Sequence, residues 1–383
     1  MLCTRRARRV AAIVVATLAA SVFTLGMPAR AANPIIVGDA IDFLRTTQIS
    51  GNTPATGSGA WDTNAAFPFY TYDAVLAVAE QAQTSSTWST SQALTAVTNF
   101  TNGAGQNPLA FMDLMADNLV TPGEAAKTLV LFAAPLGMSF TAYNPSGDGD
   151  TVNLTSLIGL PGPDGAYAPD FAFNDTLYAA LATKIITGAV APTTVAYTKA
   201  GQKTDGSWSY DHDSGTTTDA DIDTTGLALM ALLASGLTAD DPAVQLGLHY
   251  LADQQTAGGS WEFFGSASTE SSSRAMLAIA AAGFDVNSVC WRDTVAPELT
   301  GTTFVGADAA MEGFANLDGS IAAPGAFNVT YSTAQSVEGL QRSWLPITRA
   351  APRDCITPAI PPADGGASTI VPAPIVLTPA FTG

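Results

Sequence analysis

Two segments of the chain are apolar at almost every position. They read LALMALLA at 227–234 and MLAIAAA at 276–282. A helix on a protein surface shows a single apolar stripe, so helices that are apolar on nearly every face are expected to be buried all round. The pattern therefore predicts an inner layer of helices that a second layer covers.

Polar side chains precede each of these small-residue segments. The predicted helices begin near Tyr72, Asn174, Ile222 and Ser271, and their first turns contain acceptor side chains at Asp73, Asp175, Asp223 and Ser272. Such side chains suit the N-cap, where an oxygen accepts from the free amides of the first turn. Thr121-Pro122-Gly123-Glu124 predicts another start, because Thr and Glu form a capping box and Pro suits the first helical position.

A short phrase recurs before these helices. QKTDGSW and QTAGGSW share Gln, three residues, Gly, Ser and Trp, and a longer version leads from Gln48 to Trp61; the repeat positions are Gln48, Trp61, Gln202, Trp208, Gln255 and Trp261. Weaker copies end at Tyr167 and Ile321. We interpret the phrase as a turn in which the Trp ring covers the end of a helix pair and the Gln amide bonds helix-end groups.

Helix pairs of roughly fifty residues fit six times between residues 34 and 350, and repeats of this size are typical of stacked helical units. An inner ring of apolar helices surrounded by an outer ring makes an all-α (α/α)6 toroid. The predicted fold class is therefore an α/α-toroid repeat domain over 34–350.

Both ends of the chain differ from this domain. Residues 1–31 combine a basic start, an apolar run and an Ala-x-Ala exit, which predicts a secretory signal peptide. Residues 356–383 are rich in Pro, Ala and Thr and predict an extended tail. We therefore expect a secreted or cell-surface protein with no membrane span after signal removal.

The net charge of the chain argues against some classes of binding partner. Without the five signal arginines, 10 basic residues face 33 acidic ones, and the formal net charge falls from −18 to −23. Such a charge opposes binding to nucleic acid. Cys290 and Cys355 form an even pair in an exported chain and predict one disulfide. A monomer is expected.

The repeats resemble those of squalene and oxidosqualene cyclases. The segments that carry the resemblance are Phe43-Leu44-x3-Gln48, Gln202-x3-Gly206-Ser207-Trp208 and Tyr250-Leu251-x3-Gln255-x3-Gly259-Ser260-Trp261. Related turns occur in protein prenyltransferase β subunits and in cobalamin carriers. The resemblance covers most of 34–345, and it implies a toroid more strongly than it implies an activity.

The catalytic groups of these families are not matched. Squalene-hopene-type cyclases use the central Asp of Asp-x-Asp-Asp-Thr-Ala, and aligning Asp223-Thr224 with that element puts Ala220 and Ile222 at two acid positions. Asp221 and Asp223 remain the candidate catalytic residues. The Asp-x-Cys zinc element of prenyltransferases is absent, and no metal site is predicted.

Residues 205–223 gather acids around an aromatic and a histidine. Together with the acids that begin the inner helices, they give the candidate ligand-binding residues: Asp73, Asp175, Tyr210, His212, Asp219, Asp221 and Asp223. No cofactor is predicted. Calcium stays open for this loop and for 144–155, although both lack the Glu at position twelve of an EF-hand loop.

We therefore expect a toroid that binds a small, isoprenoid or glycan-like molecule in its central cavity without catalysis. A terpene-cyclase-like or glycan-active enzyme is the first alternative, since paired acids can cleave a neutral glycan. A structural cell-surface module is the second.

Overall fold

The computed structural model describes residues 33–348, except 52, 66, 67, 69, 169–171 and 216–218. Its inner helices are buried along most of their length. They are α2 (Thr71–Gln81), α5 (Pro122–Thr128) continued by the π-helical η2 (Leu129–Ala133), α7 (Phe173–Thr187), α9 (Ile222–Ala234), α11 (Thr269–Ala281) and α14 (Val329–Gln341).

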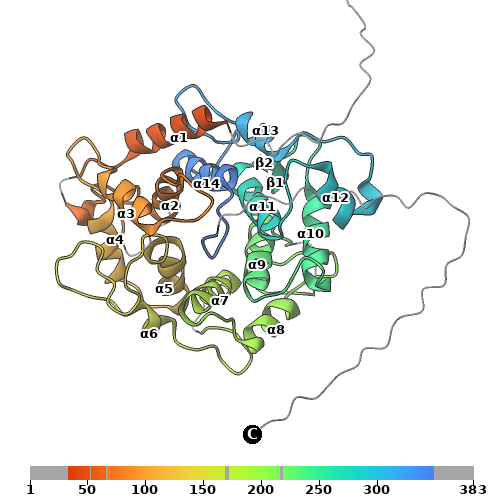
Figure 1. Cartoon of the computed structure of the whole chain (residues 1–383), viewed down its shortest axis with the longest axis horizontal. Coiled ribbons are helices and arrows are strands. Elements are labelled where there is room, and N and C mark those ends of the chain that lie inside the picture. The colour runs from red at the N-terminus through yellow and green to blue at the C-terminus, as the bar shows by residue number, and fades with distance from the viewer. Residues whose placement is uncertain are drawn as a thin grey trace, which may run out of the picture.

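The inner helices form a closed ring. Each packs on the next in the order α2, α5 with η2, α7, α9, α11 and α14, and α14 packs back on α2 (Figure 1). The outer helices surround them and are α1 (Pro34–Thr47), α3 (Thr90–Asn99), α4 (Leu109–Ala116), α6 (Leu154–Ile158), α8 (Pro192–Ala200), α10 (Pro242–Gln254), α12 (Val289–Val295) and α13 (Ala307–Glu312). The structure confirms the predicted all-α toroid of six helical units.

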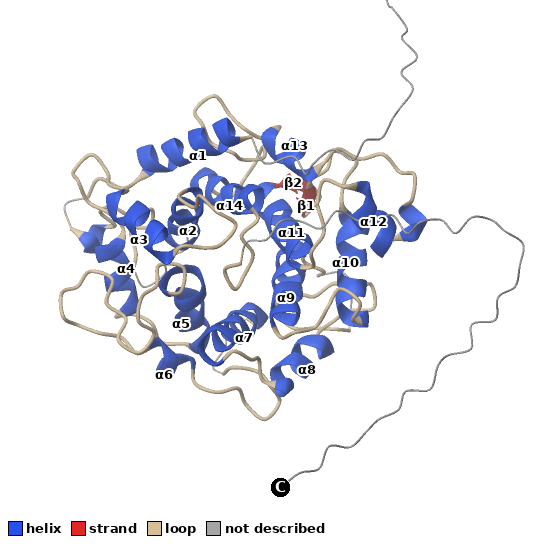
Figure 2. Ribbon diagram, in the orientation of Figure 1, coloured by secondary structure: helices blue, strands red, loops and turns tan. Residues whose placement is uncertain are grey.

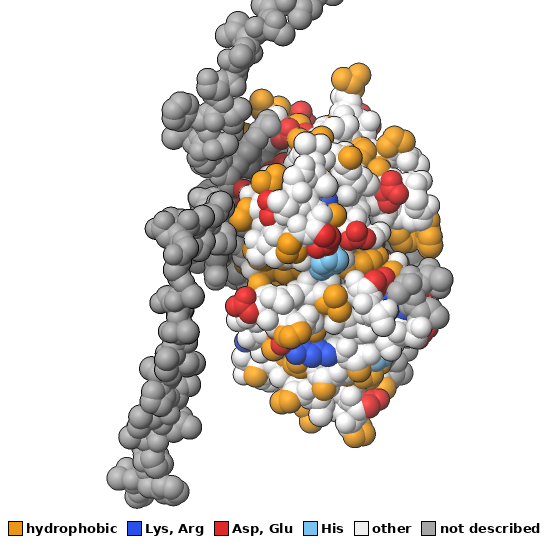
Figure 3. All heavy atoms as spheres, turned by 90° about the vertical axis from the view of Figure 1, so that its right-hand side faces the viewer, with side chains coloured by type: hydrophobic (Ala, Val, Ile, Leu, Met, Phe, Trp, Pro, Cys, Tyr) orange, Lys and Arg blue, Asp and Glu red, His pale blue; other side chains and the backbone are white. Residues whose placement is uncertain are grey.

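The helices are joined by long connecting segments that contain little other regular structure. Two short strands, β1 (Trp261–Phe263) and β2 (Ser266–Ser268), form an antiparallel hairpin before α11, and 3₁₀ turns lie at Pro54–Thr56 and Pro297–Leu299 (Figure 2). The sequence pattern did not predict the hairpin. On the face over α10 and α12, acidic, basic and hydrophobic side chains are interspersed (Figure 3).

Three turns between outer and inner helices contain the same hydrogen bonds. The indole Nε1 of each Trp donates to a carbonyl of the preceding outer helix: Trp61 to Leu44 (2.9 Å), Trp208 to Thr198 (2.6 Å) and Trp261 to Leu251 (2.8 Å). Each Gln amide donates to a turn glycine: Gln48 to Gly59 (2.6 Å), Gln202 to Gly206 (3.0 Å) and Gln255 to Gly259 (3.0 Å).

The same turns also bind the following inner helix. The backbone N–H groups of Trp61, Trp208 and Trp261 donate to the hydroxyls of Thr71, Thr225 and Ser272. Tyr167 and Ile321, at the ends of the weaker copies, donate in the same way to Thr176 and Thr333. The turns therefore join the two layers through buried polar contacts.

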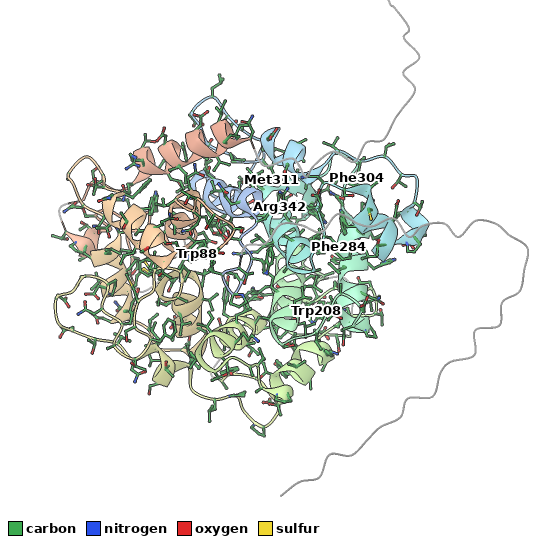
Figure 4. The ribbon with its side chains drawn as sticks, in the orientation of Figure 1. Trp88, Trp208, Phe284, Phe304, Met311 and Arg342 are labelled. Carbon is green, nitrogen blue, oxygen red and sulfur yellow. The ribbon has the colours of Figure 1, made fainter. Side chains whose placement is uncertain are left out.

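Trp208 illustrates the packing of such a turn (Figure 4). A Cβ placed on Gly247 of α10 would lie 2.9 Å from the Trp208 ring and 2.8 Å from Leu229 of α9, so the ring fills the space between the two helices. A side chain at position 247 would displace it.

The inner helices begin within two residues of the predicted starts, and α9 begins at Ile222 as predicted, but the predicted N-caps are wrong. The N-caps are Tyr70 for α2, Ala172 for α7, Asp221 for α9 and Ser268 for α11, so Asp73, Asp175, Asp223 and Ser272 are not N-caps. Other acceptors take over the capping: the Asp62 carboxylate accepts from the N–H groups of Tyr70 (2.9 Å) and Thr71 (2.7 Å). The capping box of Thr121 and Glu124 is present as predicted.

Candidate functional site

A cavity of about 870 Å³ lies at the N-terminal halves of the inner helices. Aromatic, acidic and amide side chains from several elements converge on it. The lining consists of Lys127, Ala172, Asn174, Asp175, Tyr178, Tyr210, Asp219, Ala220, Asp221, Ile222, Asp223, Leu227, Tyr250, Gln254, Glu262, Phe263, Phe264, Gly265, Arg274, Tyr331 and Gln335. Four tyrosines and five carboxylates thus share one concave site.

Asp221 and Asp223 perform different tasks although they are two residues apart. Asp221 caps α9: its Oδ1 accepts from the N–H of Asp223 (3.0 Å), and its Oδ2 accepts from the N–H (3.2 Å) and the hydroxyl (2.5 Å) of Thr224. Both Asp221 oxygens are therefore used by the helix start. Asp223 lies within the first turn, and its Oδ1 is buried without a hydrogen-bond partner.

The Asp223 carboxyl is a weak acid for its type. Burial, together with the neighbouring Asp221 carboxylate, raises its pKa from 3.8 to about 7, although Arg274 opposes this shift. Removing a carboxylate from water disfavours its charged form, and a like charge nearby does the same. A large part of the Asp223 side chains is therefore protonated near neutral pH, which gives the cavity wall an acid able to donate a proton.

The loop before α9 is held by a buried lysine. Lys203, which is 2% exposed, forms an ion pair with Asp219 (2.9 Å) and donates to the Asp213 carbonyl. His212 turns away from the cavity: its ring stacks on Tyr197 of α8 at 3.9 Å, and its Nε2 lies 2.9 Å from the Tyr197 carbonyl oxygen.

A charged cluster lies beneath the cavity, where α2, α11 and α14 meet. The Asp73 Oδ1 accepts from Arg274 Nη2 (3.2 Å) and Gln335 Nε2 (3.0 Å), and Arg274 Nη1 lies 3.9 Å from Glu338 Oε2. Burial, with help from the Asp73 charge, raises the pKa of Glu338 well above its ordinary value. Neighbouring tyrosines and carboxylates raise the pKa of Arg274 against the effect of burial.

Lys127 and Tyr178 complete the wall beside this cluster. The Lys127 Nζ lies 6.0 Å from the centre of the Tyr178 ring and 5.0 Å from that of Tyr72. Burial lowers the pKa of Lys127 and raises that of Tyr178 to about 12. The Tyr178 hydroxyl therefore keeps its proton at neutral pH.

The structure brings five of the seven predicted binding residues together in the lining: Asp175, Tyr210, Asp219, Asp221 and Asp223. Asp73 is fully buried below the cavity, where it orients Arg274 and Gln335, and His212 packs on the outer layer.

Sequence reasoning missed several residues at the site: Lys127, Tyr178, Tyr250, Glu262, Phe263, Phe264, Arg274, Tyr331, Gln335 and Glu338. Arg274 and Glu338 carry a signal that could have identified them. An ionisable side chain inside a helix that is otherwise buried all round faces either a polar cavity or a charged partner.

Two other predictions depend on residues outside the described part. Residues 1–31, the tail at 356–383 and Cys355 lie outside it, so the signal peptide and the disulfide with Cys290 stay predictions. Among the residues that are described, no group of three or more His, Cys, Asp or Glu side chains is arranged to hold a metal ion. Within the same residues, every helix is too short or too polar to cross a bilayer.

No family model and no curated protein matches the chain. Among solved structures, the apo form of the type II terpene cyclase MstE from Scytonema is similar, with 15% sequence identity, a TM-score of 0.47, and coverage of 81% of this chain and 97% of that one. The assignment of the toroid rests on the closed ring of inner helices, not on this likeness.

Proposed function

We propose that the central cavity binds a polyhydroxylated ligand of the oligosaccharide type. The observation that supports this proposal is the composition of the lining, in which carboxylate and amide groups and the hydroxyl-bearing rings of four tyrosines surround one cavity of about 870 Å³. An extracellular location is part of the proposal and rests on the sequence of residues 1–31.

Sugar hydroxyls both donate and accept hydrogen bonds. Carboxylates such as Asp175 and Glu262 can accept from them, and amides such as Gln254 can accept and donate. A tyrosine adds a ring that packs on the apolar face of a sugar and a hydroxyl that bonds at its edge. The lining therefore suits a molecule whose surface alternates between polar edges and apolar faces.

Other ligand classes fit this lining less well. An isoprenoid would cover Asp223, Arg274 and their neighbours without replacing the hydrogen bonds of water, which costs free energy for every buried polar group. An anionic ligand would face five carboxylates but only two basic side chains, Lys127 and Arg274. A neutral glycan avoids both penalties.

Isothermal titration calorimetry with defined probes tests the proposal. The panel consists of neutral hexasaccharides with α-1,4, β-1,4 and β-1,3 linkages, an acidic hexasaccharide and a short polyprenol. We expect one neutral hexasaccharide to bind, and we expect Ala220→Trp, which adds a bulky ring to the cavity lining, to abolish binding. The matched control is Ala189→Trp, at an exposed position outside the lining.

Binding of the polyprenol alone, or hexasaccharide binding that survives Ala220→Trp, would overturn this assignment. The first result would move the ligand class to isoprenoids, and the second would place the site elsewhere on the molecule.

Acid catalysis is a second candidate function, and the position of Asp223 favours it. Its carboxyl belongs to the cavity lining and has a pKa of about 7. A general acid works best when its pKa is near the working pH. In this mechanism Asp223 donates its proton to the glycosidic oxygen of a bound sugar as the bond to the anomeric carbon breaks, and water adds to that carbon while another carboxylate of the lining accepts the proton of the water.

Turnover of the bound hexasaccharide separates binding from catalysis. If the protein is an enzyme, Asp223→Asn should retain binding but lower the rate by at least about a hundredfold, in line with the usual contribution of a general acid. The absence of products from wild-type protein with bound saccharide would leave binding as the function.

A further inference from the structure

The tip of the β1–β2 hairpin is a tight turn with an unusual residue. Trp261 pairs with Ser268 and Phe263 with Ser266, which leaves Phe264 and Gly265 as the two turn residues. Their φ angles are 49° and 77°, so both lie in the left-handed region. Positive φ at both positions is the pattern of a type I′ turn, which favours Asn-Gly or Asp-Gly.

Phenylalanine at the first of these positions is unfavourable. A side chain other than that of Asn or Asp carries a steric cost in the left-handed region. Phe264 gains little from packing in return, because 93% of it is exposed and 48% of Phe263 is exposed as well. The two rings lie 4.3 Å apart at an angle of 58° and form a small aromatic surface.

This surface is continuous with the cavity. Glu262, Phe263, Phe264 and Gly265 all belong to the cavity lining, together with Asp175, Tyr210 and Asp223. The hairpin therefore extends the wall of the site from the buried polar floor to an exposed aromatic tip. A ligand that leaves the cavity along this wall meets the two rings.

We propose that Phe263 and Phe264 form an outer subsite for a chain-like oligosaccharide, whose inner units occupy the cavity and whose outer units pack on the rings. The inference rests on the proposed function and adds to it that the ligand is longer than the cavity. Exposed aromatic rings suit this task, because they bind the apolar face of a sugar without a buried pocket.

A series of saccharides of increasing length tests the subsite. The probes are the di-, tri-, tetra- and hexasaccharide of the linkage that binds, titrated into wild type, Phe264→Asn and the control Phe327→Ala. Phe327 is 80% exposed and lies outside the cavity lining. Asn suits the type I′ turn, so Phe264→Asn should fold at least as stably as wild type.

The expected result depends on length. The disaccharide should bind wild type and Phe264→Asn equally, whereas the hexasaccharide should lose about fivefold to tenfold in affinity with Phe264→Asn and nothing with Phe327→Ala. Urea unfolding should show Phe264→Asn to be as stable as wild type or more so. A loss of binding without a loss of stability is not expected of a residue that serves the fold alone.

Equal affinities of wild type and Phe264→Asn at every length would overturn the subsite while leaving the cavity as the binding site. Equal losses at every length would also overturn it, because they would place Phe264 against the inner units. If no saccharide binds wild type, the proposed function fails and the subsite fails with it.

Discussion

The turns before the inner helices and the tip of the β1–β2 hairpin both contain residues with positive φ, but they differ in the type of that residue and in the burial of the neighbouring aromatic ring. In the turn at Trp208, the residue with positive φ is Gly206, and the aromatic ring is fully buried with its indole N–H bonded. In the hairpin, the first residue with positive φ is Phe264, and its ring is exposed.

The comparison separates architecture from recognition. In the turn at Trp208, which joins the two layers, the glycine and the buried aromatic both agree with the fold, as expected of a sequence that specifies one structure. In the hairpin, which borders the cavity, Phe264 has a backbone conformation that is unfavourable for its residue type, and its exposed side chain gains little packing in return. Violations of this kind occur mostly at functional sites.

We expect the largest loss of stability on replacement of the buried Trp208. Trp208→Ala should lower the free energy of unfolding by about 3–5 kcal/mol, because it leaves a cavity between α9 and α10. Trp208→Phe keeps most of the ring contacts but leaves the Thr198 carbonyl without its donor, and should cost about 1–3 kcal/mol. Urea denaturation measures both losses. A loss below about 1 kcal/mol for Trp208→Ala would contradict the claim that the buried ring stabilises the turn.

The turn glycine should come next. A Cβ at Gly206, where φ is 94°, would lie 2.1 Å from the Leu246 carbonyl oxygen, so Gly206→Ala adds a clash to the cost of left-handed backbone. We expect a loss of about 3 kcal/mol or more.

Gly188 provides the matched control for this glycine. Its φ is 82°, but a Cβ added there would meet no atom within 4 Å, so Gly188→Ala should cost only about 1–2 kcal/mol. Equal losses at the two glycines would show that close packing contributes nothing at Gly206.

Asp221 and Asp223, at the start of α9, allow a further comparison between a residue that stabilises the fold and a residue of the cavity wall. Asp221→Ala removes the N-cap of α9 and should lower the free energy of unfolding by about 1 kcal/mol. Asp223→Asn should leave that free energy unchanged or raise it at pH 8, because wild type must hold a charged carboxylate in a poorly solvated place. A greater loss from Asp223→Asn than from Asp221→Ala would reverse the roles of the two residues.

The pH dependence of stability isolates the Asp223 carboxyl. Its pKa is about 7 in the folded protein and near 3.8 in the unfolded chain, so the folded state binds more protons between these values. The contribution of Asp223 to stability therefore falls as pH rises from about 4 to 7 and levels off above that. The difference in unfolding free energy between wild type and Asp223→Asn should follow this curve, and a difference independent of pH would contradict the raised pKa.

The fold could be predicted from the sequence because its signals are local. Helices that are apolar all round, such as 227–234, and the repeated Gln-to-Trp phrase each mark one unit of the ring. The N-cap of α2 was wrongly assigned because the acceptor that serves its first turn, Asp62, lies in the preceding loop and reaches the helix through the folded turn.

The site could be predicted only in part. Asp175, Tyr210 and the acids of 219–223 lie close to helix starts or in one acidic loop, which made them visible. Arg274 and Asp73 are 201 residues apart in the chain and meet only because the ring closes. The aromatic tip of the hairpin was missed because two strands of three residues give no periodic pattern.

Native mass spectrometry of the protein isolated from its own source tests the central claim most directly. We expect a retained molecule made of sugar units, released on denaturation and absent from Ala220→Trp but present in Ala189→Trp. A retained isoprenoid, or a sugar retained equally by both variants, would contradict the claim that the cavity binds an oligosaccharide.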